Sequence, residues 1–595
     1  MEEHKDIFSL IKTEESNYQT LPITVNEGYE WSMFKHIKLS LLYKLSTFET
    51  GNSDEKPFKN IMRPILNLQY RAEGFDVKDI ILFVNEVKNY YKSFLVKKYH
   101  EKWARENEID TMIDDLVESY VDFGGALLKN VNDVKPEVVP MQRIAFCDQT
   151  DILSGPICEK HFYSPDQIKE MEKQGWGDKK NGADITIDEL ITLSRDYKRI
   201  SDSKKESKTP GKYMEIYELH GMLPDRWLGK GGDKYSRQLH IVAFYQKEGG
   251  EAQGVCLYKG KEAELIYKFI ARDKIYGRAL GYGGAEELFE SQVWTNYSAI
   301  RIKDLLDAAS KVIYQTADTA FAKRNKINNV NSQEILTHEE GHPISQVDTY
   351  PRNIRLFENS IQEWEDSAKM TGAANESIMG ESPAAGTPFK LQELVTAEAH
   401  SLHEYRKGKL ATFLDGVYKE WIIPYIVKEI NQGQEFLAEL DLDELQAVAD
   451  NIITNEANKL IKEKILNGEI VELEEVETLK QKTRENFMKG GNKKFVKILK
   501  KEMKDAPLSV KVNVAGKQKY LSQITDKLVN IFRQIVGNPA ILDDPRMAKL
   551  FNQIIESSGL SPIDFYAPPR PQLPEQPLQQ GQVAPQPKEN LAAIQ

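Results

Sequence analysis

Residues 281–324 read GYGGAEELFESQVWTNYSAIRIKDLLDAASKVIYQTADTAFAKR, and their apolar side chains recur every three or four positions. Because an α-helix makes one turn every 3.6 residues, this spacing predicts one long helix with a single buried stripe. The stripe consists of Leu288, Phe289, Val293, Tyr297, Ile300, Leu305, Ala309 and Val312.

Two further helical patterns follow this first helix. The segment RNIRLFENSIQEWEDSAKM predicts a helix over 352–370, and an apolar face from Leu391 to Trp421 predicts a third helix over 389–430. A polar segment, 323–351, separates the first two helices. The second separator, 371–388, reads TGAANESIMGESPAAGTP, and its glycines and prolines interrupt helical structure. We therefore expect three helices joined by two loops.

The remainder of the chain predicts a mainly helical α+β protein. Residues 1–78 look irregular apart from short helices near 31–48, and 58–77 suggests a strand and turn. Strands with alternating polarity are expected in VKPEVVPMQRIAFCD (134–148), YMEIYELHGMLP (213–224), QLHIVAFYQ (238–246) and GVCLYKG (254–260). Helices are expected over 79–103 and 108–123, and from Pro165 with Ser164 as N-cap.

Composition limits the possible functions. The chain has 595 residues and a net charge of −12, which argues against wrapping nucleic acid on a basic surface. An acidic protein can still enclose DNA loosely. The three cysteines, Cys147, Cys158 and Cys256, are too few and too widely spaced for a disulfide framework, and we expect buried thiols. No apolar run approaches the ~18 residues of a membrane span, and the N-terminus lacks the features of a signal peptide.

The segment His338-Glu339-Glu340-Gly341-His342 matches H-E-x-x-H, the zinc-protease pattern that needs both histidines on one helix face. Gly341 and the following Pro343 oppose a helix there, so we favour a polar loop or hairpin tip over a zinc site. His400 and His403, three residues apart, are more typical of hydrogen-bonded helix residues than of metal ligands. We expect no cofactor, no metal and no enzymatic activity.

Glycine-rich and basic segments have simpler interpretations than ligand binding. Gly229-Lys230-Gly231-Gly232 lacks the order of a phosphate-binding loop and predicts a turn. The glycines of 281–284 favour close helix packing over an anion site. The basic run 489–504 favours an amphipathic helix with a solvated lysine face, although contact with phosphate stays open.

The order of these elements resembles the portal proteins of tailed bacteriophages, most closely those of the crAss-like phages. The resemblance covers roughly residues 60–565 and rests on the order of segments, since no single motif is diagnostic. The segments are DLVESYVDFGGALLKNV (115–131), VVPMQRIAFCDQTD (138–151), PICEKHFYSPDQIKEM (156–171), YELHGMLP (217–224), LYKG (257–260), KIYGRALGYGGAEELFESQVWTNYSAIRIKDLLD (274–307), the three-helix region with its small-residue loop, and VKVNVAGKQKYLSQITDKLVNIFRQIVGNP (510–539).

The resemblance implies a division of the chain into the parts of a portal ring subunit. It implies an α+β wing over 1–284, stem helices within 285–370 that flank a short clip at 323–351, a tunnel loop at 371–388, a long wing helix at 389–430, a helical crown at 431–566, and a Pro/Gln-rich flexible tail at 567–595. The clip is shorter than in many portals, which leaves its fold open.

The same resemblance implies partners and contact residues. A portal is a ring, with twelve subunits expected, at one capsid vertex of the virion. Double-stranded DNA passes through it, and it contacts the major capsid protein, the terminase large subunit and neck or adaptor proteins; assembly takes place in the host cytoplasm, and no membrane is involved. The residues expected near DNA are Lys369, Met370, Asn375, Ile378, Met379 and Lys390. Those expected to dock terminase or adaptors are Asn328, Asn331, Glu334, His338, Glu339 and His342.

Two other interpretations remain at this point. A virion structural or scaffold protein without a channel would share the composition and the helical patterns. A metallohydrolase that uses His338-Glu339-Glu340-Gly341-His342 would bind zinc and would lose activity on Glu339→Gln. A repulsive, negatively charged channel wall agrees with the portal interpretation, because it lets a DNA duplex slide.

Overall fold

The structure is a computed structural model. It describes residues 2–48, 56–77, 80–84, 90–131, 135–194, 214–229, 234–246, 252–325, 335–348, 350–351, 353–374, 401–431, 434–439, 461–462, 476–478, 480–482, 493–498 and 508–512. The chain divides into two compact units. The first unit is Met1–Phe83, Tyr99–Glu429 and Leu508–Thr525, and the second is Val84–Lys98, Ile430–Pro507 and Asp526–Gln595.

A five-stranded antiparallel sheet in the first unit contains the strands predicted at 213–224, 238–246 and 254–260, and a strand at 157–163 that was not predicted. Its spatial order is β10-β9-β8-β7-β6, so strands that are consecutive in the sequence are neighbours in the sheet. The strands are β6 (Ile144–Phe146), β7 (Ile157–Tyr163), β8 (Met214–Pro224), β9 (Tyr235–Gln246) and β10 (Ala252–Lys261). Alternate residues of β8 enter different cores, since Ile216 belongs to one apolar cluster and Tyr217 to another. The sheet is therefore covered by apolar side chains on both faces.

Helices cover the two faces of this sheet. The Ile216 cluster includes residues of α6 (Pro165–Glu170) and α7 (Ile187–Ser194), and the Tyr217 cluster includes residues of α1 (Glu2–Thr20) and α2 (Met33–Lys44). Helix α6 has the predicted Ser164 N-cap, with a reciprocal hydrogen bond between the cap and Gln167, and Pro165 at its first position. All three cysteines are buried and free, as expected.

A second sheet has three strands in the order β11-β4-β5, and its central strand, β4, comes directly after α5 (Ile109–Phe123) in the sequence. Its strands are β4 (Gly125–Val131), β5 (Lys135–Val139) and β11 (Tyr267–Ala271). Gly124 joins α5 to β4 at a left-handed φ of +77°, and a Cβ at this position would lie 2.4 Å from the Gly281 carbonyl oxygen. The glycines that precede α8 therefore serve close packing, as predicted.

The N-terminal region contains elements that the sequence analysis did not predict. Helix α1 is continuous, and 62–73 forms helix α3 (Met62–Glu73) where a strand and turn were expected. Pro64 lies in the first turn of α3, where its missing N–H costs no hydrogen bond, and the buried positions recur at helical spacing. The helix predicted over 79–103 is confirmed over its second part by α4 (Tyr90–Glu106), but it is wrong at 80–84, which form strand β3 (Ile80–Val84) and pair with β16 (Leu508–Val512).

The three predicted central helices form, with changed limits. Helix α8 (Gly284–Ala309) ends earlier than expected, because Val312 and Ile313 lead into strand β12 (Tyr314–Gln315), which pairs with β13 (Ser345–Gln346). Helix α10 (Ile354–Thr371) agrees with the prediction. Within the third predicted helix, the structure has α13 (Ser401–Val417), a π-helical turn (Tyr418–Ile422) and α14 (Ile423–Asn431), and 389–400 lies outside the described residues. The wider turn precedes Pro424, whose ring clashes with a regular α-helical path.

In the second unit the structure describes a two-stranded ladder. Strand β14 (Gln434–Glu439) pairs antiparallel with β15 (Lys493–Ile498), so the amphipathic helix predicted for the basic run 489–504 is wrong at these residues. Of the predicted crown, the structure also describes strand β16 and the short stretches 461–462, 476–478 and 480–482; the rest of the crown and the tail lie outside the described residues. No described helix is long and apolar enough to cross a membrane.

Candidate functional sites around the α8–α10 pair

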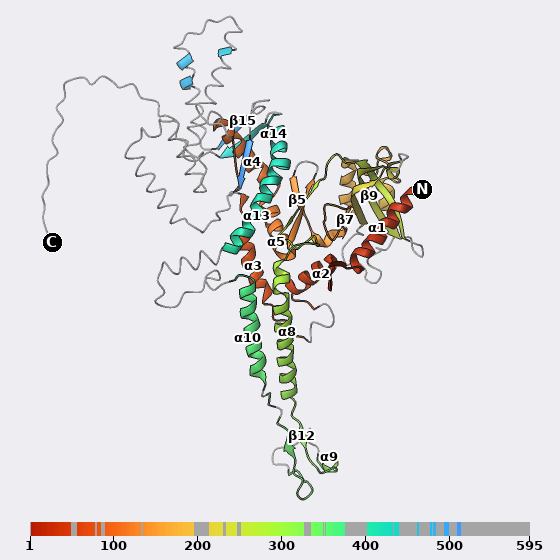
Figure 1. The fold of residues 1–595 in the computed structure, drawn as a ribbon, viewed down its shortest axis with the longest axis vertical. Coiled ribbons are helices and arrows are strands. Elements are labelled where there is room, and N and C mark those ends of the chain that lie inside the picture. Colours follow the sequence, from red (N-terminus) through yellow and green to blue (C-terminus); the bar gives the residue numbers. More distant parts are fainter. Residues whose placement is uncertain are drawn as a thin grey trace, which may run out of the picture. The chain divides into compact units, whose positions relative to one another are not determined.

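Helices α8 and α10 lie side by side in opposite directions and lead to the β12–β13 hairpin (Figure 1). Their indoles Trp294 and Trp364 stack with ring centroids 6.2 Å apart. The last fully buried residue of α8 is Ser298, and α10 buries only Ile361 and Ala368. Large apolar side chains remain exposed on the pair, including Trp294, Tyr297, Leu306 and Leu356. The outer faces of this pair are not covered by the part of the chain that the structure describes.

The tip beyond α8 is organised by two polar side chains. The Asp318 carboxylate accepts from the amides of Ala320 and Glu339 at 2.9 and 3.0 Å and pairs with Arg324. The Asn325 amide makes two reciprocal hydrogen bonds with the Thr337 backbone, at 2.7 and 3.0 Å. These contacts join residues on either side of 326–334, a segment that lies outside the described residues. The tip is thus a defined polar structure.

Three of the predicted docking residues, His338, Glu339 and His342, are exposed at this tip, while Asn328, Asn331 and Glu334 lie outside the described residues. The H-E-x-x-H segment is a loop, as predicted. Gly341 has a left-handed φ of +81°, and each imidazole contacts a neighbouring backbone carbonyl, Glu339 O at 2.9 Å and Glu340 O at 3.1 Å. The two histidines therefore do not share a helix face, which the zinc-protease geometry requires.

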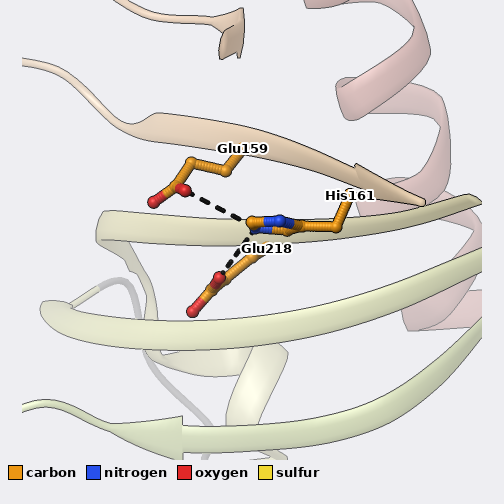
Figure 2. Close-up of side chains that lie close together, drawn as sticks. All are labelled: Glu159, His161 and Glu218. Carbon is orange, nitrogen blue, oxygen red and sulfur yellow. Dashed lines mark hydrogen bonds and ion pairs between the residues drawn. The ribbon is translucent and has the colours of Figure 1, made fainter. Parts of the chain in front are cut away.

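One group of described side chains has metal-ligand spacing, on the sheet at Glu159 and His161 of β7 and Glu218 of β8 (Figure 2). Glu159 and Glu218 are directly opposite in the strand register. The Lys129 ammonium lies 3.0 Å from Glu159 and 2.6 Å from Glu218, so the position of a cation is already taken by a side chain. The arrangement is a buried ion network and does not require a metal.

His220 extends this network, with ring nitrogens 3.0 Å from Glu218 and 2.7 Å from Glu262. Burial alone would lower the pKa of His220, but these hydrogen bonds raise it. The pKa of Glu218 lies well below its usual range, because Lys129 and the two histidines outweigh the effect of burial. We name Lys129, Glu159, His161, Glu218, His220 and Glu262 the wing network.

At the other end of α10, the chain turns sharply. Gly372 caps the helix, Ala373 has a left-handed φ of +51°, and the Ala374 amide donates to the Lys369 carbonyl at 2.8 Å. Of the residues predicted to contact DNA, Lys369 is half-buried and Met370 is 79 % exposed. Asn375, Ile378, Met379 and Lys390 lie outside the described residues, so the structure does not test their placement.

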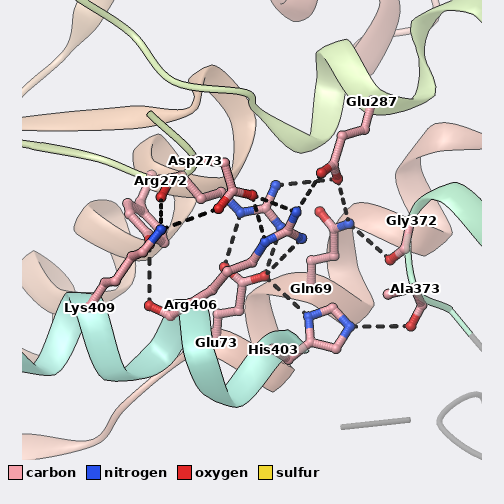
Figure 3. Close-up of polar contacts among 11 residues, drawn as sticks. Gln69, Glu73, Arg272, Asp273, Glu287, Gly372, Ala373, His403, Arg406 and Lys409 are labelled. Carbon is pink, nitrogen blue, oxygen red and sulfur yellow. Dashed lines mark hydrogen bonds and ion pairs between the residues drawn. The ribbon is translucent and has the colours of Figure 1, made fainter. Parts of the chain in front are cut away.

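A buried cluster of charges surrounds this turn (Figure 3). We name it the junction cluster; it consists of Gln69 and Glu73 from α3, Arg272 and Asp273 after β11, Glu287 from α8, Gly372 and Ala373 at the end of α10, and His403, Arg406 and Lys409 from α13. Glu73 and Arg272, both fully buried, form a two-point ion pair at 2.7 and 3.2 Å. Arg406 bridges Asp273 at 2.7 Å and Glu287 at 2.5 Å.

The charges of the junction cluster stabilise one another around the fully buried Glu73 and Arg272. Burial alone would raise the pKa of Glu73, but hydrogen bonds from His403 and Arg272 lower it below its usual value. Burial likewise opposes the charge of Arg272, yet its pKa is raised because Glu73 and Glu287 lie beside it. Glu73 and Arg272 therefore both stay ionised, and five elements are tied together at one point.

The sequence analysis missed the junction cluster. Glu73 and Gln69 lie on the buried face of α3 with Ile65 and Leu66. Polar residues on an otherwise apolar helical face could have indicated a buried network, had 58–77 been assigned as a helix. His403 was singled out as a hydrogen-bonded helix residue, and that interpretation is confirmed, because both of its ring nitrogens have polar partners. Nothing in the sequence indicates that Arg272 is the partner of Glu73.

Comparison with known proteins adds little to this picture. No protein-family model matches the chain, and no curated protein matches it. Among solved structures, a chain from "Neck of empty GTA particle computed with C6 symmetry" aligns at a TM-score of 0.32 and 10% identity, covering 71% of this chain and 92% of that chain. A chain from "Virion of native gene transfer agent (GTA) particle" aligns at a TM-score of 0.31 and 9% identity, covering 93% of this chain and 99% of that chain. At these TM-scores neither likeness supports a conclusion about this chain.

Proposed function

We propose that the chain is the subunit of a phage portal: a ring, with twelve copies expected, at one capsid vertex of the virion, through which double-stranded DNA is packaged and ejected. The observation that carries this proposal is the α8–α10 pair. It connects the buried junction cluster to an exposed polar tip, and it leaves apolar side chains such as Trp294 and Leu356 uncovered. A helix pair of this kind suits a subunit whose neighbours in a ring complete the apolar contacts.

The electrostatics support passage of DNA through such a ring. A ring built from copies with a net charge of −12 repels phosphates on average, so that DNA would slide without tight binding. Within this proposal the segment 371–388 faces the duplex, with Asn375, Ile378 and Met379 nearest to it. Lys369 and Lys390 on either side of the segment would give weak, exchangeable phosphate contacts.

The polar tip supports a docking role in the same proposal. His338, Glu339 and His342 are exposed there, and Asp318 and Asn325 hold the loop that carries them. A polar tip of defined shape suits partners that bind one after another, here the terminase large subunit and then neck or adaptor proteins. The major capsid protein would surround the ring at the vertex. We assign no catalytic role and no cofactor to the chain.

Deletion of 375–388, with a short glycine linker, tests the proposed DNA contact. We expect rings to assemble, because the junction cluster is retained, and we expect packaged DNA to be lost or poorly retained. The control is the tip variant His338→Ala/His342→Ala, which we expect to weaken terminase or adaptor binding without affecting DNA retention in filled particles. Normal packaging and retention in the deletion variant would show that this segment does not contact DNA.

A virion structural or scaffold protein without a channel is the alternative. It would use the same exposed apolar faces of α8 and α10 to assemble, so the observation on Trp294 and Leu356 supports both proposals. Electron microscopy of the purified protein separates them, because a single-file ring with an axial hole is expected of a portal alone.

A further inference from the structure

An ordered row of aromatic side chains lies on one side of the α8–α10 pair. The Trp364 indole of α10 stacks on Trp294 of α8, with ring centroids 6.2 Å apart and an interplanar angle of 11°. Trp294 in turn meets Tyr297 edge to face at 5.7 Å, and the Arg301 guanidinium lies over the Tyr297 ring, 5.2 Å from its centroid. We name Trp364, Trp294, Tyr297 and Arg301 the aromatic ladder.

The ladder is ordered by its own contacts and stays open to solvent in the part of the chain that the structure describes. Trp294, Tyr297 and Arg301 follow one another at intervals of three and four residues, so they share one face of α8. Trp294 is 44 % exposed and Tyr297 46 %, and the Arg301 Nε donates to the Tyr297 hydroxyl at 3.3 Å. Tryptophan, tyrosine and arginine are the residues that most often dominate binding energy, and ordered aromatic rings lose little conformational freedom on binding. The ladder therefore has the composition and the order of an interaction surface.

The polar groups of the ladder require hydrogen-bond acceptors on a partner. An indole N–H and a guanidinium donate hydrogen bonds and accept none. Arginine binds carboxylates with favourable geometry and charge. The surface that fits the ladder is thus one that presents carboxylate or carbonyl oxygens from side chains.

Helix α10 carries such a surface on its other side. Glu358, Gln362 and Asp366 are exposed and four residues apart, so they form a row along the helix. The Gln362 amide donates to the Asp366 carboxylate at 3.2 Å. Gln362 and Asp366 are each two positions from Trp364, and two positions correspond to about 200° around an α-helix. These three residues, which we name the acidic row, therefore face away from the ladder.

The ladder and the acidic row lie at the same height on the helix pair. The Ser298 and Ser360 hydroxyls are 3.4 Å apart, and Trp294 stacks on Trp364. The antiparallel pairing thus places 294–301 beside the stretch of α10 that carries the acidic row. Rotation about a ring axis preserves height along that axis, and each subunit of a closed ring presents different surfaces to its two neighbours. In a ring whose helix pairs run along the axis, the ladder of one copy meets the acidic row of the next.

We propose that the aromatic ladder of one copy binds the acidic row on α10 of the neighbouring copy. The partner is a second copy of this chain, because the chain itself supplies the complementary surface at the matching height. This contact rests on the proposed function, since it assumes a ring, and it specifies which sides of the α8–α10 pair meet there.

Charge reversal in the full-length protein tests this contact. The quantity measured is the protein concentration at which half of the copies are assembled, by analytical ultracentrifugation. We expect Arg301→Glu to raise this concentration at least about tenfold, because it places a carboxylate against the acidic row. Glu358→Lys/Asp366→Lys should raise it similarly. Every contact takes the ladder from one copy and the row from the next, so a chain with all three substitutions should recover most of the loss.

The matched control is Arg143→Glu, the same charge reversal at an exposed arginine in the 3₁₀ turn Met141–Arg143, which should leave assembly unchanged. Wild-type assembly of the Arg301→Glu variant would overturn the proposed contact. An assembly defect that the three substitutions together do not relieve would overturn it as well. In both cases, rings of the wild-type protein would leave the proposed function standing. A wild-type protein that forms no ring would refute the proposed function and this contact together.

Discussion

Replacing Arg272 with methionine removes the central cation of the junction cluster while keeping a side chain of similar length. Arg272 and Glu73 are both fully buried, and their pair has two contacts, at 2.7 and 3.2 Å. Breaking a buried pair by removing one partner costs about 3–5 kcal/mol, because the other charge stays buried. Glu73 would still contact His403 at 3.1 Å and have Arg406 at 3.8 Å. We therefore expect the lower end of this range, about 3 kcal/mol.

Tryptophan fluorescence during denaturant unfolding is the appropriate assay for Arg272→Met. All seven tryptophans, Trp31, Trp103, Trp176, Trp227, Trp294, Trp364 and Trp421, belong to the first compact unit. The signal therefore follows the unit that contains the junction cluster. The control is Arg143→Met, the same change at an exposed arginine, for which we expect less than about 0.5 kcal/mol.

A double-mutant cycle separates the ion pair from other effects of the substitution. Glu73→Gln/Arg272→Met removes both charges of the pair, so we expect it to lose less stability than the sum of the two single variants, by about 2 kcal/mol. An Arg272→Met variant as stable as Arg143→Met would refute the reasoning. Additive losses in the cycle would show that the two residues do not stabilise each other.

Three further predictions follow from other parts of the first unit. Gly124→Ala should destabilise the first unit by more than about 1 kcal/mol, because φ is +77° and the new Cβ would meet the Gly281 carbonyl. The same unfolding assay measures this loss. Gly408→Ala, at a helical position with open space around it, should not destabilise the unit. The folded-state pKa of His220 is raised, so the stability that its charge contributes is complete below the unfolded pKa of about 6.5 and is lost as pH rises through the folded pKa. The melting temperature should therefore fall between about pH 7 and about pH 9 and fall less in His220→Gln, and an equal fall in both would contradict this. Elemental analysis of the purified protein should find no zinc at His338 and His342. Stoichiometric zinc in the wild-type protein that is absent from the His338→Ala variant would contradict the loop assignment.

The elements that the sequence predicted correctly are those with a strong local signal. The strands within 213–260 are short segments rich in β-branched and aromatic residues, separated by glycine-rich turns, and their ladder confirms them. Helix α6 carries a capping box, and α10 has regular helical spacing. In the H-E-x-x-H segment, Gly341 and Pro343 were enough to exclude a helix. In each case the deciding residues lie within a few positions of one another.

The elements that the sequence missed depend on distant partners. Strand β3 is set by its pairing with β16, more than 400 residues away in the chain, while local spacing favoured a helix. Helix α8 ends before Val312 because 314–315 pair with 345–346. The junction cluster brings Glu73, Arg272 and His403 together from three elements, and no spacing in the sequence reveals that geometry.

The proposed function requires that copies of this chain form a ring around a channel. Electron cryomicroscopy of the purified, assembled protein, with particles viewed along their axis, shows whether they do. The proposal predicts a closed single-file ring with an axial opening wide enough for a DNA duplex, and with α8 and α10 of neighbouring copies in contact. A monomer at all concentrations, or a particle without an axial opening, would contradict it.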